Sequence, residues 1–286
     1  MTLLLTGASG FIGRRIDHMI STQLAEVDVV RLDHRWDSID DIRRLIPDRI
    51  DACVHLAWTG SAAPDYLTNE SSNRRSFTAS LELVRVLAER ECQHLVVPGS
   101  CAEYAESDHM LREDSPLRAD SPYADCKIRF HQALLKFGIP FAWARFFNVV
   151  GPGESPGRLM PSVVRSLLNR TEMPLSPGAQ IRDFIDVDDA ARALLSLSET
   201  RQVGVFNICR GEPVALRDFL LLLAEVVHAD PALLKFGLRS YGLVDPLFVV
   251  GDPSRLQASV RDWSPKFDTR KIAHRIVTYV RGLELP

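Results

Sequence analysis

The chain has 286 residues, of which 46% are hydrophobic and 25% charged, and its formal net charge is -3 at pH 7. This composition is typical of a globular protein, and the length suits one large domain or one domain with a smaller lobe. A slightly acidic balance argues against nucleic acid as a partner, because a phosphate-binding surface usually leaves a basic excess. No apolar run approaches the roughly 18 residues of a membrane span, so no membrane partner is expected.

Short apolar runs alternate with helical stretches along most of the chain. Strands are predicted at residues 2–6, 28–32, 52–56, 94–98, 141–145 and 203–208. Helices are predicted at residues 11–22, 38–45, 74–91, 122–137, 159–168, 189–197 and 216–227. This alternation predicts an α/β fold, a Rossmann doubly wound parallel sheet whose ligands bind at the carboxyl ends of the strands.

Proline becomes frequent after Asn148, which indicates a change in architecture. We expect residues 1–155 to form a dinucleotide-binding domain, to which residues 183–210 return. Residues 156–182 and 211–286 are expected to form a smaller substrate-binding lobe, with one strong helix in its last part.

The sequence TGASGFIG (residues 6–13) lies between the first strand and the first helix. Glycines let the backbone turn sharply and approach a pyrophosphate, and the helix N-terminus offers N–H groups and a positive dipole end. The alternative is a tight structural turn. Cofactor contacts are expected from Gly7, Ser9, Gly10, Phe11, Ile12 and Gly13.

Asp33 ends the second predicted strand, 20 residues after Gly13, which is the spacing of a ribose-binding carboxylate. It would accept hydrogen bonds from ribose hydroxyls and repel the extra phosphate of NADP, which favours NAD as the cofactor. Arg14 and Arg35 lie where a guanidinium could bind that phosphate, so NADP stays possible.

Ser121 and Pro122 open a predicted helix in which Tyr123 and Lys127 are four residues apart and share one face. A phenol with a pKa near 10 is a poor proton shuttle at neutral pH, but a neighbouring ammonium favours the phenolate. Ser100, just past the fourth strand, would bond the same substrate oxygen. The three residues are the predicted catalytic set; the alternative for the pair is an amphipathic surface contact.

These segments resemble the extended short-chain dehydrogenase/reductase family, the NAD-dependent epimerase/dehydratase group. The resemblance extends from residue 2 to about residue 193 and includes VHLA (54–57), RFFNVVGPG (145–153) and RDFIDVDD (182–189). It implies that Leu56 and Ala57 contact the cofactor and that the substrate is a nucleotide-sugar. It further implies that Asn148 and Arg182 hold the pyrophosphate and that the segment beginning at Leu159 lines the nucleobase. A salt bridge to Asp183 or Asp186 is the alternative for Arg182.

The chain departs from this family at several positions. Cys101 and Ala102 stand where the 4,6-dehydratases carry Asp-Glu, so dehydration is disfavoured, and Glu103 is expected to be structural. Val249 replaces a second phosphate-binding arginine, and a helix usual before Trp263 is expected to be mostly deleted. Cations that would compensate for the lost arginine are Lys136, Arg158, Arg239 and Arg255.

Three functions stay open at this point. The first is a nucleotide-sugar 4-epimerase or 4-ketoreductase, in which Tyr123 moves the hydroxyl proton during hydride transfer. The second keeps this chemistry but acts on a carbonyl or hydroxyl compound without a nucleotide. The third is a redox-inactive regulator that senses NAD(H), although it predicts degenerate catalytic residues.

Assembly and compartment follow from weaker signals. The resemblance implies a homodimer that packs helices 74–91 and 122–137, with Leu81, Val84, Leu87 and Ala88 as an apolar stripe that could equally face the sheet. The five cysteines are scattered, without a CxxC pair or a histidine cluster, so neither disulfides nor a metal site are expected. A strand that begins almost at Met1 leaves no room for a signal peptide, and the expected location is cytoplasmic.

Overall fold

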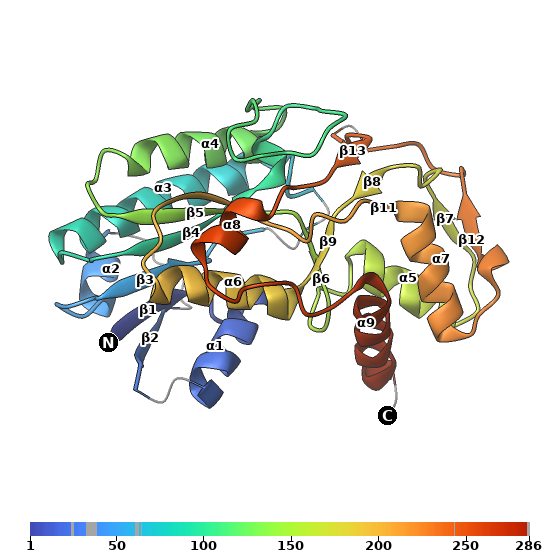
Figure 1. Cartoon of the computed structure of the whole chain (residues 1–286), viewed down its shortest axis with the longest axis horizontal. Coiled ribbons are helices and arrows are strands. Elements are labelled where there is room, and N and C mark those ends of the chain that lie inside the picture. Colours follow the sequence, from blue (N-terminus) through green and yellow to red (C-terminus); the bar gives the residue numbers. More distant parts are fainter. Residues whose placement is uncertain (24–25, 33–38, 61–62, 64, 243, 285–286) are drawn as a thin grey trace.

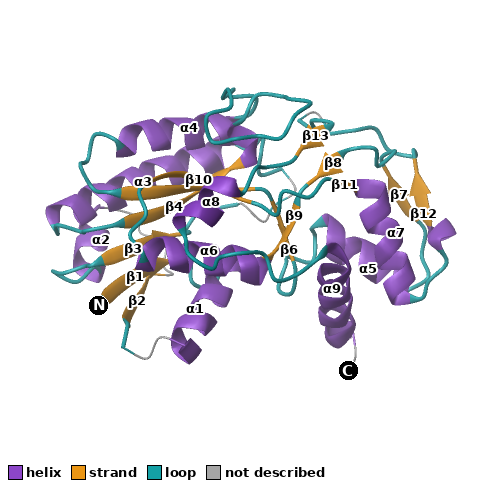
Figure 2. Ribbon diagram, viewed as in Figure 1, coloured by secondary structure: helices purple, strands orange, loops and turns teal. Residues whose placement is uncertain are grey.

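A six-stranded parallel sheet forms the centre of the molecule (Figures 1 and 2). The computed structural model describes residues 1–23, 26–32, 39–60, 63, 65–242 and 244–284. The strand order is β10-β5-β4-β3-β1-β2, as expected for a doubly wound fold, and the predicted fold class is confirmed. The bounds are β1 (Thr2–Thr6), β2 (Asp28–Leu32), β3 (Ala52–His55), β4 (Leu95–Ser100), β5 (Phe141–Phe146) and β10 (Gly204–Ile208).

Helices cover both faces of this sheet. One face carries α1 (Phe11–Gln23), α6 (Val187–Glu199) and the six-residue α8 (Ser254–Ser259). The other face carries α2 (Ile39–Leu45), α3 (Glu70–Glu89) and α4 (Pro122–Leu134). Side chains alternate along each strand, so Leu3 and Leu5 pack under α1 and α6 while Leu4 packs under α2 and α3.

The apolar stripe on α3 belongs mainly to this core. Val84 and Leu87 are fully buried against the sheet and α4, and Leu81 and Ala88 are partly buried beside them. The stripe therefore faces inward, and any dimer formed through α3 must use its remaining, more polar face.

A second hydrophobic cluster lies beyond the carboxyl ends of the strands. It is built by α5 (Leu159–Leu168), α7 (Leu216–Val227) and α9 (Thr269–Glu284), which lie together at the right of Figure 1. Small strand pairs flank it: β6 (Asn148–Val150) with β9 (Phe184–Asp186), β7 (Met173–Leu175) with β12 (Leu234–Phe236), and β8 (Ile181–Arg182) between β11 (Val214–Ala215) and β13 (Phe248–Val249).

The expectation of a single strong helix in this C-terminal region is wrong, because α9 is longer than α7. Its apolar residues recur at helical spacing and are buried against α5 and α7: Ile272, Ala273, Ile276, Val277 and Val280. Charged and polar residues interrupt this apolar set along the chain, so no continuous apolar run marks the helix in the sequence.

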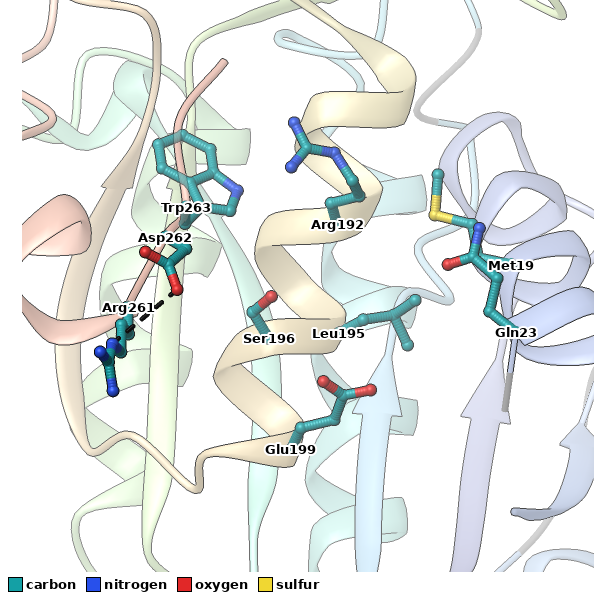
Figure 3. A pocket seen from close by; sticks show the side chains of 9 residues that line it. All are labelled: Met19, Gln23, Arg192, Leu195, Ser196, Glu199, Arg261, Asp262 and Trp263. Carbon is teal, nitrogen blue, oxygen red and sulfur yellow. Dashed lines mark ion pairs between the residues drawn. The ribbon is translucent and has the colours of Figure 1, made fainter. Parts of the chain in front are cut away.

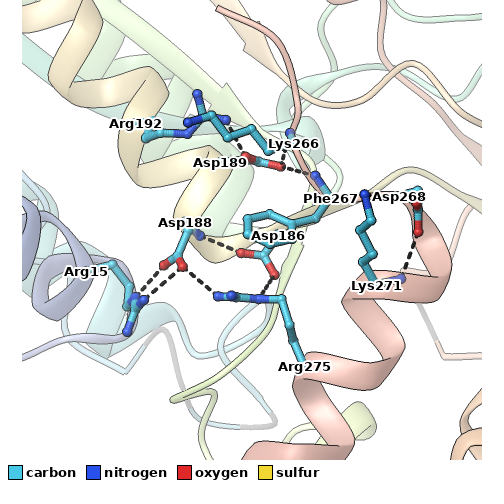
Figure 4. A network of polar contacts seen from close by, with 10 residues as sticks. All are labelled: Arg15, Asp186, Asp188, Asp189, Arg192, Lys266, Phe267, Asp268, Lys271 and Arg275. Carbon is cyan, nitrogen blue, oxygen red and sulfur yellow. Dashed lines mark hydrogen bonds and ion pairs between the residues drawn. The ribbon is translucent and has the colours of Figure 1, made fainter.

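A network of ion pairs joins α9 to α1 and α6 (Figure 4). Asp188 on α6 accepts from Arg15 of α1 and from Arg275 of α9, and Arg275 also donates to Asp186 at 2.9 Å. Asp189 accepts from the backbone N–H groups of residues 266 and 267. The network fixes the position of α9 relative to the helix that follows the glycine loop.

Replacing Asp188 by alanine is expected to lower the free energy of unfolding by about 1 to 3 kcal/mol, because two guanidinium groups lose their shared carboxylate. Urea denaturation would measure the loss. Glu89→Ala is the matched control, since Glu89 also accepts two bonds from one arginine but on the exposed surface. An equal loss in both variants would contradict a special role for this network.

No helix among these described ranges is long and apolar enough to cross a membrane.

Candidate active site

The glycine loop is packed too tightly for a side chain at Gly7 or Gly13. Gly7 has a φ of +69°, and a Cβ there would lie 2.9 Å from the backbone nitrogen of Ala57. A Cβ on Gly13 would lie 2.0 Å from the carbonyl oxygen of Gly7. The loop thus folds back on the first turn of α1, whose N–H groups have no acceptors within the helix and which contains no acidic residue. This geometry fits a pyrophosphate.

Buried hydrogen bonds join the carboxyl ends of β1 and β3. The Thr6 hydroxyl bonds His55 Nδ1 at 2.7 Å and accepts from the backbone N–H of Ala57 at 3.1 Å. His55 Nε2 bonds the Ser80 hydroxyl at 2.9 Å, and burial lowers the pKa of His55 to about 3. His55 is therefore a neutral structural bridge. Leu56 and Ala57 follow it, half-buried beside the glycine loop. Asp33 and Arg35 lie outside the described residues.

Ser100, Tyr123 and Lys127 come together at the carboxyl end of β4. Ser100 ends β4 and caps the turn at Cys101–Glu103, while Ser121 caps α4 and so places Tyr123 in its first turn. The Ser100 side chain lies close enough to the Tyr123 phenol to lower its pKa. The Lys127 ammonium lies 5.7 Å from the centre of the Tyr123 ring and donates to the carbonyl oxygen of Pro98 at 3.0 Å.

Burial has the largest effect on the pKa values of Tyr123 and Lys127. It raises the pKa of Tyr123 well above its usual range, with the Tyr66 phenol as a second cause, while the Ser100 side chain acts in the opposite direction. Burial lowers the pKa of Lys127 to about 7, and the Glu103 carboxylate counteracts this effect. An anionic Tyr123 therefore needs more positive charge nearby than Lys127 alone provides.

Two aromatic residues at this site are absent from the sequence-based predictions. The Lys127 ammonium lies 3.6 Å from the centre of the Trp58 ring, and Trp58 Nε1 donates to Asn73 at 2.8 Å. The Tyr66 ring packs edge-on against Tyr123, with centroids 5.3 Å apart. Both follow β3, whose carboxyl end lies beside that of β1. Their position directly after this strand was the one feature of the sequence that could have placed them at the site.

Glu103 is structural, as expected. Its carboxylate is fully buried and accepts from the Ser100 backbone N–H at 2.6 Å, from Trp143 at 3.0 Å and from Arg145 at 2.8 Å. These bonds fix the turn that carries Ser100.

Asn148 and Arg182 lie where the chain passes from the sheet to the second cluster. Asn148 Nδ2 donates to the carbonyl oxygen of Asp183 at 3.1 Å. Arg182 is 9% exposed and forms a salt bridge with Asp245. The alternative expectation, a salt bridge to Asp183 or Asp186, is therefore wrong. The Arg182 charge acts on Cys101, whose pKa burial raises to about 12.

Asp183 instead organises the loops around Arg182. Its fully buried carboxylate accepts from the backbone N–H groups of Arg210 and Gly211, both at 2.8 Å, and of Gly251 at 3.4 Å. Val249 is buried beside Cys101 in a small apolar cluster. Leu159 is 37% exposed at the start of α5.

Of the four cations named as replacements for the lost arginine, only Arg158 is shown beside a residue of this site. Its guanidinium carbon lies 5.1 Å from the centre of the Tyr66 ring. Arg255 packs on Phe206, a residue of β10, at 5.3 Å. Lys136 is exposed after α4, and Arg239 is exposed near β7.

A cavity of about 170 Å³ lies elsewhere, between α1, α6 and the segment at Trp263 (Figure 3). None of the predicted site residues lines it. Among the described residues, no three His, Cys, Asp or Glu gather as metal ligands.

This chain is similar to several proteins of known function or structure. The model of the NAD dependent epimerase/dehydratase family matches residues 3–209. GDP-6-deoxy-D-mannose reductase of Pseudomonas aeruginosa is 25% identical over 89% of this chain and 84% of its own length. CDP-abequose synthase of Salmonella typhimurium is 25% identical over 94% and 95%, respectively. The structure of Thermus thermophilus UDP-glucose 4-epimerase with NAD superposes with a TM-score of 0.87, at 22% identity and 99% coverage of both chains, which shows the fold.

Proposed function

Because the chain belongs to the NAD dependent epimerase/dehydratase family, we propose that it is a nicotinamide-dependent oxidoreductase of a nucleotide-sugar, acting at carbon 4 of the sugar as a ketoreductase. One observation carries this proposal. Ser100, Tyr123 and Lys127 converge at the edge of the sheet formed by the carboxyl ends of the strands, where the glycine loop also lies. The names of the relatives support a nucleotide-sugar as the substrate.

The glycine loop and the first turn of α1 hold the dinucleotide pyrophosphate, with contacts from Gly7, Ser9, Gly10, Phe11, Ile12 and Gly13. Leu56 and Ala57 lie beside this loop, and Asp33 binds the adenosine ribose. NAD is the expected dinucleotide and NADP the alternative. When bound, the dinucleotide supplies or accepts the hydride.

Tyr123 donates its hydroxyl proton to the carbonyl oxygen of the sugar as the carbon is reduced. Ser100 bonds the same oxygen and orients it. The charged Lys127 stabilises the phenolate left on Tyr123 and bonds the nicotinamide ribose. Residues 156–182 and 211–286 bind the remainder of the substrate, with Asn148 and Arg182 at the pyrophosphate and Leu159 near the base.

A 4-epimerase is the second candidate, because Asp33 favours NAD and an epimerase keeps this cofactor bound. A 4,6-dehydratase is disfavoured, since Cys101 is half-buried against apolar side chains with a raised pKa, and neither it nor Ala102 can serve as an acid or base at a sugar carbon. A carbonyl substrate without a nucleotide becomes the favoured alternative if no nucleotide-sugar binds.

The pH dependence of reduction follows from Lys127. Its pKa of about 7 means that the charged form is lost as pH rises through neutrality, so kcat is expected to fall above about pH 7. Trp58→Leu removes the aromatic face from the ammonium, lowers the pKa further and moves this fall down by about one pH unit. Profiles of kcat against pH would measure the shift, and Trp58→Phe should shift less. Superimposable profiles would contradict this role of Trp58.

A homodimer through α3 and α4 is part of the proposal. Since Val84 and Leu87 face the core, the interface would use the remaining, more polar face of α3. Sedimentation at micromolar concentration should give a dimer, and a monomer would remove this assembly.

The proposed function is tested by calorimetric titration with NAD, NADH and NADPH, followed by UDP-, dTDP-, CDP- and GDP-sugars on the cofactor complex. Tight binding of one nucleotide-sugar, lost in Arg182→Gln, is the expected result. Dinucleotide binding without binding of any nucleotide-sugar would overturn the substrate class and leave a smaller carbonyl compound.

A further inference from the structure

Tyr66 brings a second phenol to the catalytic tyrosine. Its ring meets that of Tyr123 at 77°, and its backbone is held by Asn73, whose Nδ2 donates to the Tyr66 carbonyl oxygen at 2.7 Å. Burial and then the Tyr66 phenol raise the pKa of Tyr123, while burial and the Cys101 thiol raise that of Tyr66. The Tyr66 ring therefore lies directly beside the phenol that moves the proton.

Arg158 and Glu154 approach Tyr66 from the segment that leads into α5. The guanidinium of Arg158 lies over the Tyr66 ring, and its Nε is 3.6 Å from one carboxylate oxygen of Glu154. The Glu154 side chain is only 7% exposed, and its other oxygen finds no hydrogen-bond partner among the described residues. Buried polar atoms are nearly always bonded, so this oxygen marks a place for a donor from a ligand.

The charges on this group indicate which ligand it suits. Burial raises the pKa of Glu154 to about 7, and its ionised form pairs with Arg158 and would repel a phosphate, so a second anion site is disfavoured. Tyr66 and Arg158 donate, whereas the Glu154 carboxyl group accepts through its carbonyl or carboxylate oxygen. A sugar hydroxyl does both, and neighbouring hydroxyls on one ring match this combination of donors and acceptors.

We propose that Tyr66, Arg158 and Glu154 bind ring hydroxyls of the substrate's sugar next to the reacting carbon, and so select for sugars that carry them. This inference rests on the proposed function. The nicotinamide ribose also carries neighbouring hydroxyls, but the proposed ribose ligand is Lys127, which lies against Trp58. Tyr66 packs directly on Tyr123, whose hydroxyl meets the substrate.

The test compares two 4-keto nucleotide-sugars that differ only in the presence of a hydroxyl at the ring carbon adjacent to the ketone. Tyr66→Phe and Glu154→Gln should each lower kcat/KM for the hydroxylated compound by about ten- to a hundredfold, mainly through KM. For the deoxy compound the same variants should stay within about threefold of the unmodified protein. Tyr279→Phe, on α9, is the matched control and should change neither value.

The remaining outcomes separate the sources of failure. An equal loss for both compounds would assign Tyr66 a merely structural role and overturn the inference. A weaker calorimetric Kd for NADH or NADPH, with unchanged discrimination between the sugars, would assign the hydroxyls to the cofactor and overturn it too. If the unmodified protein reduces neither these nor any other nucleotide-sugar, the proposed function itself fails and the inference fails with it.

Discussion

Tyr123→Phe is expected to lower kcat for 4-ketosugar reduction by about a thousandfold, because the hydroxyl that donates the proton is lost while the ring is kept. The ring is held by Tyr66 and Trp58, with centroids 5.3 and 6.0 Å away, so the fold should not change. The Kd values of the dinucleotide and of the nucleotide-sugar should stay within about threefold, since little binding energy is expected from this hydroxyl.

Tyr104→Phe would be a poor control, because the Tyr104 hydroxyl donates to buried Asn207 at 2.6 Å and its loss destabilises the fold. Tyr279→Phe is preferable, since it lies on α9 away from the glycine loop. If Tyr123→Phe retained more than about a tenth of the activity, the proton would come from another group, and the assignment of Tyr123 would be wrong.

Gly13→Ala has the second largest expected effect. The new methyl group would lie 2.0 Å from the Gly7 carbonyl oxygen and 2.8 Å from the Ala8 Cα, both of them backbone atoms that cannot rotate away. The loop must widen, which separates its N–H groups from the pyrophosphate. A shift of this size should weaken dinucleotide binding by about a hundredfold or more and also destabilise the fold by about 1 to 3 kcal/mol.

Gly282→Ala is the matched control for this variant, because nothing lies within 4 Å of a Cβ at that position of α9. Calorimetric titration with NAD and NADPH, together with thermal unfolding, would separate the effect on binding from the effect on stability. Unchanged dinucleotide binding in Gly13→Ala would show that the loop is only a structural turn.

The sheet could be predicted from the sequence because its strands are short, apolar and separated by amphipathic helices. The glycine loop and the pair at Tyr123 and Lys127 were visible for a similar reason, since each depends on local spacing. Trp58 and Tyr66 were not, because their contacts with α4 join segments that are far apart along the chain. The partner of Arg182 was also hidden, as Asp245 comes from a loop 63 residues later.

The helix α9 was missed in the sequence for a different reason. Its apolar face is regular, yet its contribution depends on α5 and α7, which cover that face in the folded chain. The role of Asp183 could not be predicted either. Three backbone N–H groups from two distant loops meet its carboxylate, and local sequence patterns do not record such convergence.

The central claim is that this chain transfers a hydride to carbon 4 of a nucleotide-sugar, with Tyr123 as the proton donor. The most direct test is to supply NADH or NADPH deuterated at the transferable position, together with a panel of 4-keto nucleotide-sugars, and to analyse the products by mass spectrometry and NMR. We predict one deuterium at carbon 4 of the product, one oxidised dinucleotide for each sugar reduced, and loss of both in Tyr123→Phe. Deuterium at another position, or no incorporation into any nucleotide-sugar while the dinucleotide binds, would contradict the account.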